Sequence, residues 1–207
     1  MSGAEIDYYY TVSSPWTYLG HDLLLAMAGR AGARVNHKAV NLGAVFQVSG
    51  GLPLEKRPIQ RQHYRLIELQ RWRAYRNKPL NIHPKFFPVD ASAGNRMVLA
   101  AGLAGEDAGR LAGALMRAVW AEERNIADPA TLRAIAGESG MDGAALLEAA
   151  ESAAVAAEYE RLTEEAKARE VFGAPTYIYR GEPFWGQDRL DFLERALKGE
   201  TAPLRLP

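Results

Sequence analysis

Residues 6–12 read IDYYYTV, and residues 13–16 read SSPW. The aromatic and β-branched run predicts a strand, and residues 18–30 predict a helix. Between the two, Ser14 falls at the capping position of the helix and Pro15 at its first helical position. The segment is therefore predicted to form a tight strand-to-helix turn.

Ser14 stands where the first turn of this predicted helix begins. That turn carries unpaired N–H donors and the positive end of the helix dipole. A hydroxyl placed there is well positioned to hold an anion such as a carboxylate, a phosphate or a thiolate. A serine can equally do no more than cap the helix, and the motif taken alone favours that simpler interpretation.

The composition excludes several classes of function. The 207 residues include 25 Lys plus Arg and 25 Asp plus Glu, so no net charge draws the chain to nucleic acid or to a membrane. The chain has no cysteine, which excludes disulfides, cysteine nucleophiles, CxxC redox chemistry and thiolate metal sites; no metal site is expected. Because no secretory leader and no run of 18 apolar residues is present, we expect a soluble, cytoplasmic protein.

Basic residues cluster locally, between residues 56 and 78. The eight are Lys56, Arg57, Arg61, Arg65, Arg71, Arg73, Arg76 and Lys78. The favoured interpretation is the solvated face of a helix, and the alternative is a local wall that binds anions.

The order of the predicted elements indicates the fold class. A second strand over 34–42 makes a β-α-β unit with the first strand and helix. The later segments are a Gly/Pro loop at 49–53, a helix at 60–76, a Pro-interrupted loop at 81–88, Ala-rich helices over 92–168 broken near Asp128-Pro129 and Gly140-Met141-Asp142, strands at 176–180 and 183–185, and a helix at 190–198. An isolated hairpin is marginal in water, so we expect the C-terminal hairpin to complete the N-terminal sheet.

This order predicts an α/β protein with a thioredoxin-like sheet and an inserted all-helical domain. We expect residues 1–45 and 170–207 to form the discontinuous thioredoxin-like domain, and residues 46–169 to form the helical one. Pro175 stands directly before a strand, where proline is permitted and where the X-Pro bond can be cis. In thioredoxin-like folds a cis-proline at this point lies beside the first helix's N-terminus. The sequence leaves the isomer of the Ala174–Pro175 bond open.

Three segments carry a family resemblance. Residues 14–19 (SPWTYL), 172–176 (FGAPT) and 184–190 (FWGQDRL) together resemble the 2-hydroxychromene-2-carboxylate isomerases. These belong, with the kappa-class glutathione transferases, to the DsbA-like branch of thioredoxin folds. Residues 68–72 (ELQRW) and 119–122 (VWAE) also look like this family, and the resemblance runs from about Asp7 to Lys198.

The resemblance implies reduced glutathione as cofactor and assigns residues to it. Ser14 occupies the position where DsbA-like oxidoreductases carry a cysteine, and its hydroxyl would hydrogen-bond the glutathione sulfur and favour the thiolate. The backbone of Ala174, next to Pro175, would pair with the cysteinyl part as a strand-like extension. Gln187 and Asp188 would receive the γ-glutamyl end, with Asp188 pairing with the ammonium.

Two departures from the family pattern affect the glycyl end of glutathione. Family members often carry an Asn in the loop after the second strand, whereas this chain has Ser49-Gly50-Gly51. They also carry a Lys where this chain has Arg61, which could still meet the glycyl carboxylate in a bidentate pair.

A second pocket is expected for the other substrate. Its candidate wall consists of Trp16, His83, Pro84, Phe86 and Phe87, because an aromatic lining with a few polar groups suits a flat aromatic acid. For His83, a hydrogen bond to loop backbone is favoured over a role as catalytic base.

The implied activity is the conversion of 2-hydroxychromene-2-carboxylate, or a similar aromatic unsaturated acid, to trans-o-hydroxybenzylidenepyruvate through a transient thiolate adduct, in aromatic compound degradation. Such nucleophilic catalysis needs no cysteine of the chain's own. The alternatives are a kappa-like glutathione transferase and a non-catalytic thiol- or peptide-binding module on the same scaffold. The resemblance also implies a homodimer.

Overall fold

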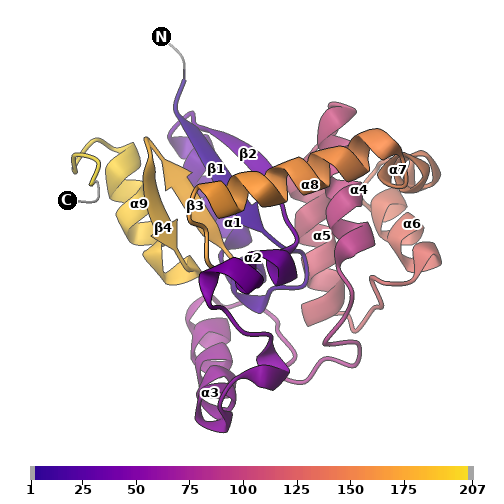
Figure 1. The fold of residues 1–207 in the computed structure, drawn as a ribbon, viewed down its shortest axis with the longest axis horizontal. Coiled ribbons are helices and arrows are strands. Elements are labelled where there is room, and N and C mark those ends of the chain that lie inside the picture. Colours follow the sequence, from indigo (N-terminus) through magenta and orange to yellow (C-terminus); the bar gives the residue numbers. More distant parts are fainter. Residues whose placement is uncertain (1–2, 205–207) are drawn as a thin grey trace.

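The computed structural model describes residues 3–204, and its chain order follows the predicted one (Figure 1). The elements are β1 (Glu5–Tyr10), α1 (Pro15–Arg30), β2 (Arg34–Ala39), α2 (Leu42–Ser49), η1 (Leu54–Lys56), α3 (Ile59–Tyr75), α4 (Ser92–Leu103), α5 (Ala108–Trp120), α6 (Pro129–Glu138), α7 (Gly143–Ala150), α8 (Ala153–Ala168), β3 (Thr176–Tyr179), β4 (Glu182–Trp185), η2 (Gln187–Arg189) and α9 (Leu190–Leu197).

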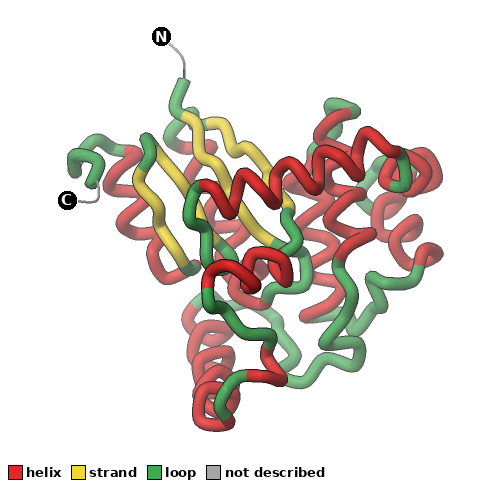
Figure 2. The backbone as a smooth tube through the Cα atoms, viewed as in Figure 1, coloured by secondary structure: helices red, strands yellow, loops and turns green. Residues whose placement is uncertain are grey.

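The four strands form one mixed sheet in the order β2-β1-β3-β4. β2 runs parallel to β1, whereas β3 is antiparallel to both β1 and β4. The C-terminal hairpin therefore completes the sheet begun at the N-terminus, and the predicted thioredoxin-like sheet is confirmed. Between β2 and β3 the chain is helix and loop, coloured red and green in Figure 2.

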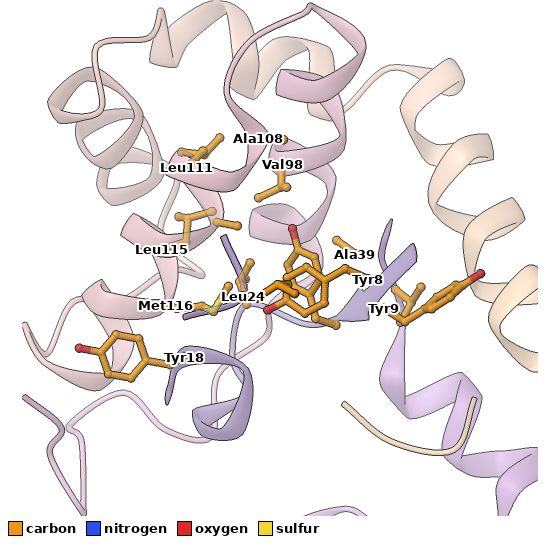
Figure 3. Close-up of a cluster of buried hydrophobic side chains, with 14 of the residues drawn as sticks. Tyr8, Tyr9, Tyr18, Leu24, Ala39, Val98, Ala108, Leu111, Leu115 and Met116 are labelled. Atoms are coloured by element: carbon orange, nitrogen blue, oxygen red, sulfur yellow. The ribbon is translucent and has the colours of Figure 1, made fainter. Parts of the chain in front are cut away.

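The two faces of β1 are covered by different helices. Tyr8 and Tyr10 are fully buried on the face that meets α1, where Tyr8 approaches His21. Tyr9 points to the opposite face and hydrogen-bonds Glu165 of α8, the helix that crosses in front of the sheet in Figure 1. Figure 3 shows Tyr8 and Tyr9 leaving the strand on opposite sides, as the pleat requires.

One short helix was not predicted. The second strand ends at Ala39 instead of continuing to residue 42, and Asn41 caps α2 by accepting the Ala44 N–H at 3.1 Å. Asp128 caps α6 in the predicted way, with Pro129 at its first position. None of the helices between residues 3 and 204 combines the length and hydrophobicity needed to cross a bilayer.

A glycine allows α1 to approach the start of η2. A Cβ on Gly20 would lie 2.7 Å from Cβ of Gln187 and 3.1 Å from the Tyr177 hydroxyl. Gly20 therefore sets how close the helix that follows Ser14 can come to Gln187.

We expect Gly20→Ala to lower the free energy of unfolding. The inserted methyl overpacks the helix contact at a cost of about 1–3 kcal/mol, which outweighs the roughly 1 kcal/mol that alanine gains over glycine within a helix. Gly29→Ala in the same helix is the control, because nothing lies within 4 Å of a Cβ there. Urea denaturation should show Gly29→Ala at least as stable as the parent; a Gly20→Ala protein of equal stability would contradict the close contact.

Two histidines lie close together on one face of the sheet, the buried His21 of α1 and the half-buried His37 of β2. His21 Nε2 lies 2.8 Å from the Gly109 carbonyl, and His37 Nδ1 lies 3.1 Å from the Tyr10 hydroxyl. Burial lowers the pKa of His21, and burial together with the nearby His21 lowers the pKa of His37 to about 4; Asp107 opposes both shifts. The folded chain therefore binds fewer protons here than the unfolded chain, whose histidines titrate near 6.5.

Stability is expected to fall as the pH drops from about 6.5 towards 4. In this window the unfolded chain takes up protons that the folded chain does not, at about 1.4 kcal/mol per pH unit for each such histidine. His37→Gln should flatten this slope, measured by urea denaturation across the range, while His63→Gln at an exposed position of α3 serves as the histidine control. Equal slopes in the parent and in His37→Gln would contradict the assignment.

Candidate functional site

The sheet register brings three loops to one end of the sheet. Tyr9 near the end of β1 pairs with Thr176 at the start of β3, which pairs in turn with Trp185 at the end of β4. The segments just beyond these positions must therefore lie at the same end: Ser13–Ser14, Ala174–Pro175 and Gly186–Asp188. Of the polar residues predicted to form the site, only Arg61 and His83 lie outside these three loops.

Ser14 forms the predicted turn. It is the N-cap of α1, its Oγ accepts the Thr17 N–H at 3.2 Å, and Pro15 takes the first helical position. The residue is only 8% exposed. Among residues 3–204 no acceptor engages its hydroxyl proton, so the group can donate to a ligand while it caps the helix.

The chain leading into this turn is held by Asn95 of α4. Its Oδ1 accepts the Val12 N–H at 3.0 Å, and its Nδ2 lies 3.2 Å from Oγ1 of Thr11 and 3.3 Å from the Val40 carbonyl. Asn95 is 1% exposed. It thus ties the ends of β1 and β2 to one helix, and sequence reasoning missed it.

The turn is also held from α5. Trp120 donates its indole N–H to the Ser13 carbonyl at 3.2 Å, and the Phe87 ring lies 4.7 Å from the Trp120 ring. Trp120 therefore connects the Phe87 ring to the turn. Trp120 was not among the predicted site residues, although it stands in the family-like segment 119–122 (VWAE).

The Ala174–Pro175 bond is cis, which answers the question that the sequence left open. The Pro175 carbonyl accepts the Gly186 N–H at 2.9 Å, so this loop is tied to the one that follows β4. A Cβ on Gly173 would lie 2.4 Å from Nε1 of Trp185. Ala174 itself is half-buried.

The two residues predicted for the γ-glutamyl end differ in exposure. Gln187 is 2% exposed, and Arg76 at the end of α3 donates to its Oε1 and to its backbone carbonyl, both at 3.0 Å. Asp188 is exposed, and Arg189 lies 3.5 Å from its carboxylate. Sequence reasoning missed Arg76 as the group that fixes this loop.

The other predicted residues lie on the inserted segments or in α1. Trp16 is half-buried in the first turn of α1, and Pro84 is buried in the loop before α4. Phe86 is half-buried, with the Lys85 ammonium 5.2 Å from its ring. His83 and Arg61 are exposed, and neither makes a side-chain hydrogen bond within residues 3–204.

The solvated-face interpretation of the basic cluster is wrong for half of its members. Lys56, Arg61, Arg71 and Arg73 are exposed, but Arg57, Arg65, Arg76 and Lys78 are partly buried. Lys78 donates to the Tyr18 carbonyl at 2.7 Å, and burial is the main cause that lowers its pKa. Burial, with nearby Arg57, lowers the pKa of Arg65 to about 10.

Comparison with known proteins agrees with this geometry. The model of the DSBA-like thioredoxin domain matches residues 5–198. A 2-hydroxychromene-2-carboxylate isomerase of Sphingobium xenophagum is 30% identical over 194 residues, which cover 93% of this chain and 97% of the relative. The solved structure of a 2-hydroxychromene-2-carboxylate isomerase superposes with a TM-score of 0.79 at 26% identity and covers 95% of both chains. The cytosolic disulfide reductase DsbM from Pseudomonas aeruginosa, solved with GSH, has a TM-score of 0.68 at 19% identity, covering 94% of this chain and 99% of that one.

The family match spans nearly the whole chain, and the isomerase relatives align along almost their full length. The chain therefore belongs to the DsbA-like thioredoxin proteins and, among them, to the 2-hydroxychromene-2-carboxylate isomerase family. The predicted resemblance and fold class are confirmed. These relatives support an isomerase role.

Replacing Asn95 by leucine should destabilise the protein strongly. The substitution leaves the buried Val12 N–H without its acceptor, and a buried donor without a partner costs about 1–3 kcal/mol. The Val40 carbonyl and Thr11 lose their partner at the same time, so we expect a loss of about 3 kcal/mol by urea denaturation. Gln47→Leu, at an exposed position of α2, is the control. Stability within about 0.5 kcal/mol of the parent would show that Asn95 does not hold the turn.

Proposed function

We propose that the protein is a glutathione-dependent isomerase that converts 2-hydroxychromene-2-carboxylate, or a similar aromatic unsaturated acid, to the trans-o-hydroxybenzylidenepyruvate form. The observation that carries the proposal is the Ser14 hydroxyl, which caps α1 and keeps its own proton free for a ligand. The isomerase relatives support the reaction class.

Ser14 suits a thiolate for two reasons. Its hydroxyl proton can be donated to a sulfur, and hydrogen bonding to the charged form lowers the pKa of a thiol. The positive end of the 16-residue helix α1 acts in the same direction. Both effects favour the ionised sulfur at neutral pH, and neither requires a cysteine in the chain.

The neighbouring loops fit the rest of glutathione. Ala174 is half-buried beside the turn, and its backbone would pair with the cysteinyl residue. The exposed carboxylate of Asp188 would pair with the γ-glutamyl ammonium, while Gln187, fixed by Arg76, would present its backbone N–H to the γ-glutamyl carboxylate. Arg61 is assigned to the glycyl carboxylate. The DsbM structure solved with GSH supports this use of the fold.

The residues of this chain divide the work between two ligands. Bound glutathione would supply a thiolate that adds reversibly to the substrate and so frees rotation about the former double bond. Ser14 would hold that sulfur ionised. Trp16, Phe86 and Phe87 would hold the flat aromatic acid against the turn, together with Pro84 and His83 in the same loop.

A kappa-like transferase would use the same thiolate and release a conjugate. Product analysis separates the two activities: unchanged glutathione recovered after turnover supports isomerisation, and a stable conjugate contradicts it. A non-catalytic thiol- or peptide-binding module would bind without turnover. We also propose a homodimer, which light scattering tests directly.

Calorimetric titration with reduced glutathione tests the cofactor, with an S-methylated analogue as control. Saturable binding that the methyl group weakens would support a thiolate beside Ser14. Absence of binding would contradict glutathione dependence and point to the Gly51 and Arg61 departures as the reason.

Ser14→Ala should lower turnover by raising the pKa of the bound thiol, with little change in glutathione affinity. The pH–rate profile of the variant should therefore shift to higher pH. Ser13→Ala is the matched control, because the link from Trp120 to residue 13 uses its backbone carbonyl. Losing the N-cap also costs about 1 kcal/mol of stability, so assays belong well below the melting temperature. An unaltered pH–rate profile in Ser14→Ala would overturn the assigned role.

A further inference from the structure

Two arginines of the basic cluster lie against aromatic rings, and one of them, Arg65, lies against the ring that holds the Ser13–Ser14 turn. The guanidinium carbon of Arg65 is 5.3 Å from the Phe87 ring centroid and 5.7 Å from that of Trp120. The guanidinium carbon of Arg57 is 5.9 Å from the Phe46 ring, and its Nε donates to the Leu52 carbonyl at 2.7 Å. Both side chains are partly withdrawn from water.

No carboxylate within residues 3–204 neutralises either arginine. Arg71 on the same helix pairs with Glu68 at 2.5 Å, but no acidic side chain lies within 4 Å of Arg57 or Arg65. The charge that acts on Arg65 is the positive Arg57, and the charge that acts most on Arg57 is the positive Arg61; the exposed Glu55 opposes it only at longer range. Partly desolvated cations near one another are unfavourable unless an anion joins them.

The aromatic contacts connect Arg65 to the reacting centre. The Trp120 ring beneath Arg65 is the same ring that donates to the Ser13 carbonyl, one residue before Ser14. A guanidinium near the ring faces keeps N–H edges free for a bidentate carboxylate. Trp120 is fully buried, but the Phe87 ring is partly exposed. A flat acid lying against Phe87 would therefore have its carboxylate at Arg65.

We infer that Arg65 binds the carboxylate of the aromatic substrate, with Arg57 adding attraction at longer range. This assignment rests on the proposed function for the identity of the substrate. It makes Arg65 a specificity residue that was absent from the predicted pocket, and it leaves the exposed Arg61, one turn earlier on α3, to the glycyl end of glutathione.

Substitution at Arg65 tests the assignment. We expect Arg65→Leu to raise the KM for the acid about 10- to 100-fold, the range expected when a charge-assisted hydrogen bond is lost. The KM for the corresponding methyl ester should change less than 2-fold, and so should the calorimetric Kd for reduced glutathione. Arg65→Lys should restore part of the preference for the acid. Arg71→Leu, which removes an exposed and already paired arginine from the same helix, should leave the KM for the acid unchanged.

A second measurement does not depend on glutathione. Binding of trans-o-hydroxybenzylidenepyruvate to the protein alone, followed by tryptophan fluorescence, should be saturable in the parent and weakened at least 10-fold in Arg65→Leu. This result would stand even if calorimetry refuted glutathione dependence. Arg65→Gln, which keeps a polar side chain of similar length, serves if the leucine variant fails to fold.

Three outcomes would overturn the inference. Equal losses for the acid and its ester would make Arg65 a packing residue only. A weakened glutathione Kd with an unchanged KM for the acid would assign the arginine to the peptide. If the parent protein does not bind the aromatic acid in the absence of glutathione, then Arg65 has no aromatic carboxylate ligand.

Discussion

The buried N–H of Val12 must find an acceptor where the chain leaves the sheet, and Asn95 provides it. A backbone donor in this position cannot stay unpaired without a cost comparable to a lost hydrogen bond. The same amide reaches Thr11 and the Val40 carbonyl, so β1 and β2 end against one helix. The direction in which Ser14 then enters α1 follows from this contact.

The inserted helices, rather than the sheet alone, fix the rest of the site. Trp120 of α5 holds the Ser13 carbonyl, and Arg76 at the end of α3 holds both carbonyl groups of Gln187. Gly20 permits the approach of α1 to that same glutamine. The sheet register brings the loops to one end, and these long-range contacts set their positions there.

Local features of the site could be predicted from the sequence, and long-range ones could not. The Ser14-Pro15 turn and the Asp128-Pro129 cap depend on neighbouring residues only, so their patterns were sufficient. Asn95 and Arg76 act on partners 83 and 111 residues away along the chain, and no periodicity reports such partners. The helix α2 was missed because its eight residues, with a glycine in the first turn, give too short a pattern.

The basic cluster shows the limit of helical periodicity most clearly. Arg61 and Arg65 stand one turn apart on α3 and look alike in the sequence, yet one is exposed and the other lies over two rings. What separates them is Phe87 of a distant loop, whose ring lies against Arg65. The sequence could therefore predict that cations gather near the site, but only the packing of the distant loop selects which cation faces it.

A carboxylate lies near the C-terminal end of α3, and a guanidinium lies in its first half. Near its C-terminal end, the contact of Arg76 with Gln187 leaves the neighbouring Asp188 carboxylate exposed. In its first half, Arg65 stands without a carboxylate partner among the described residues. Eleven residues of helix separate Arg65 from Arg76, a rise of about 16 Å. A site with a carboxylate near one end of α3 and a guanidinium this far along the helix suits two ligands, an amine-bearing peptide and an acid.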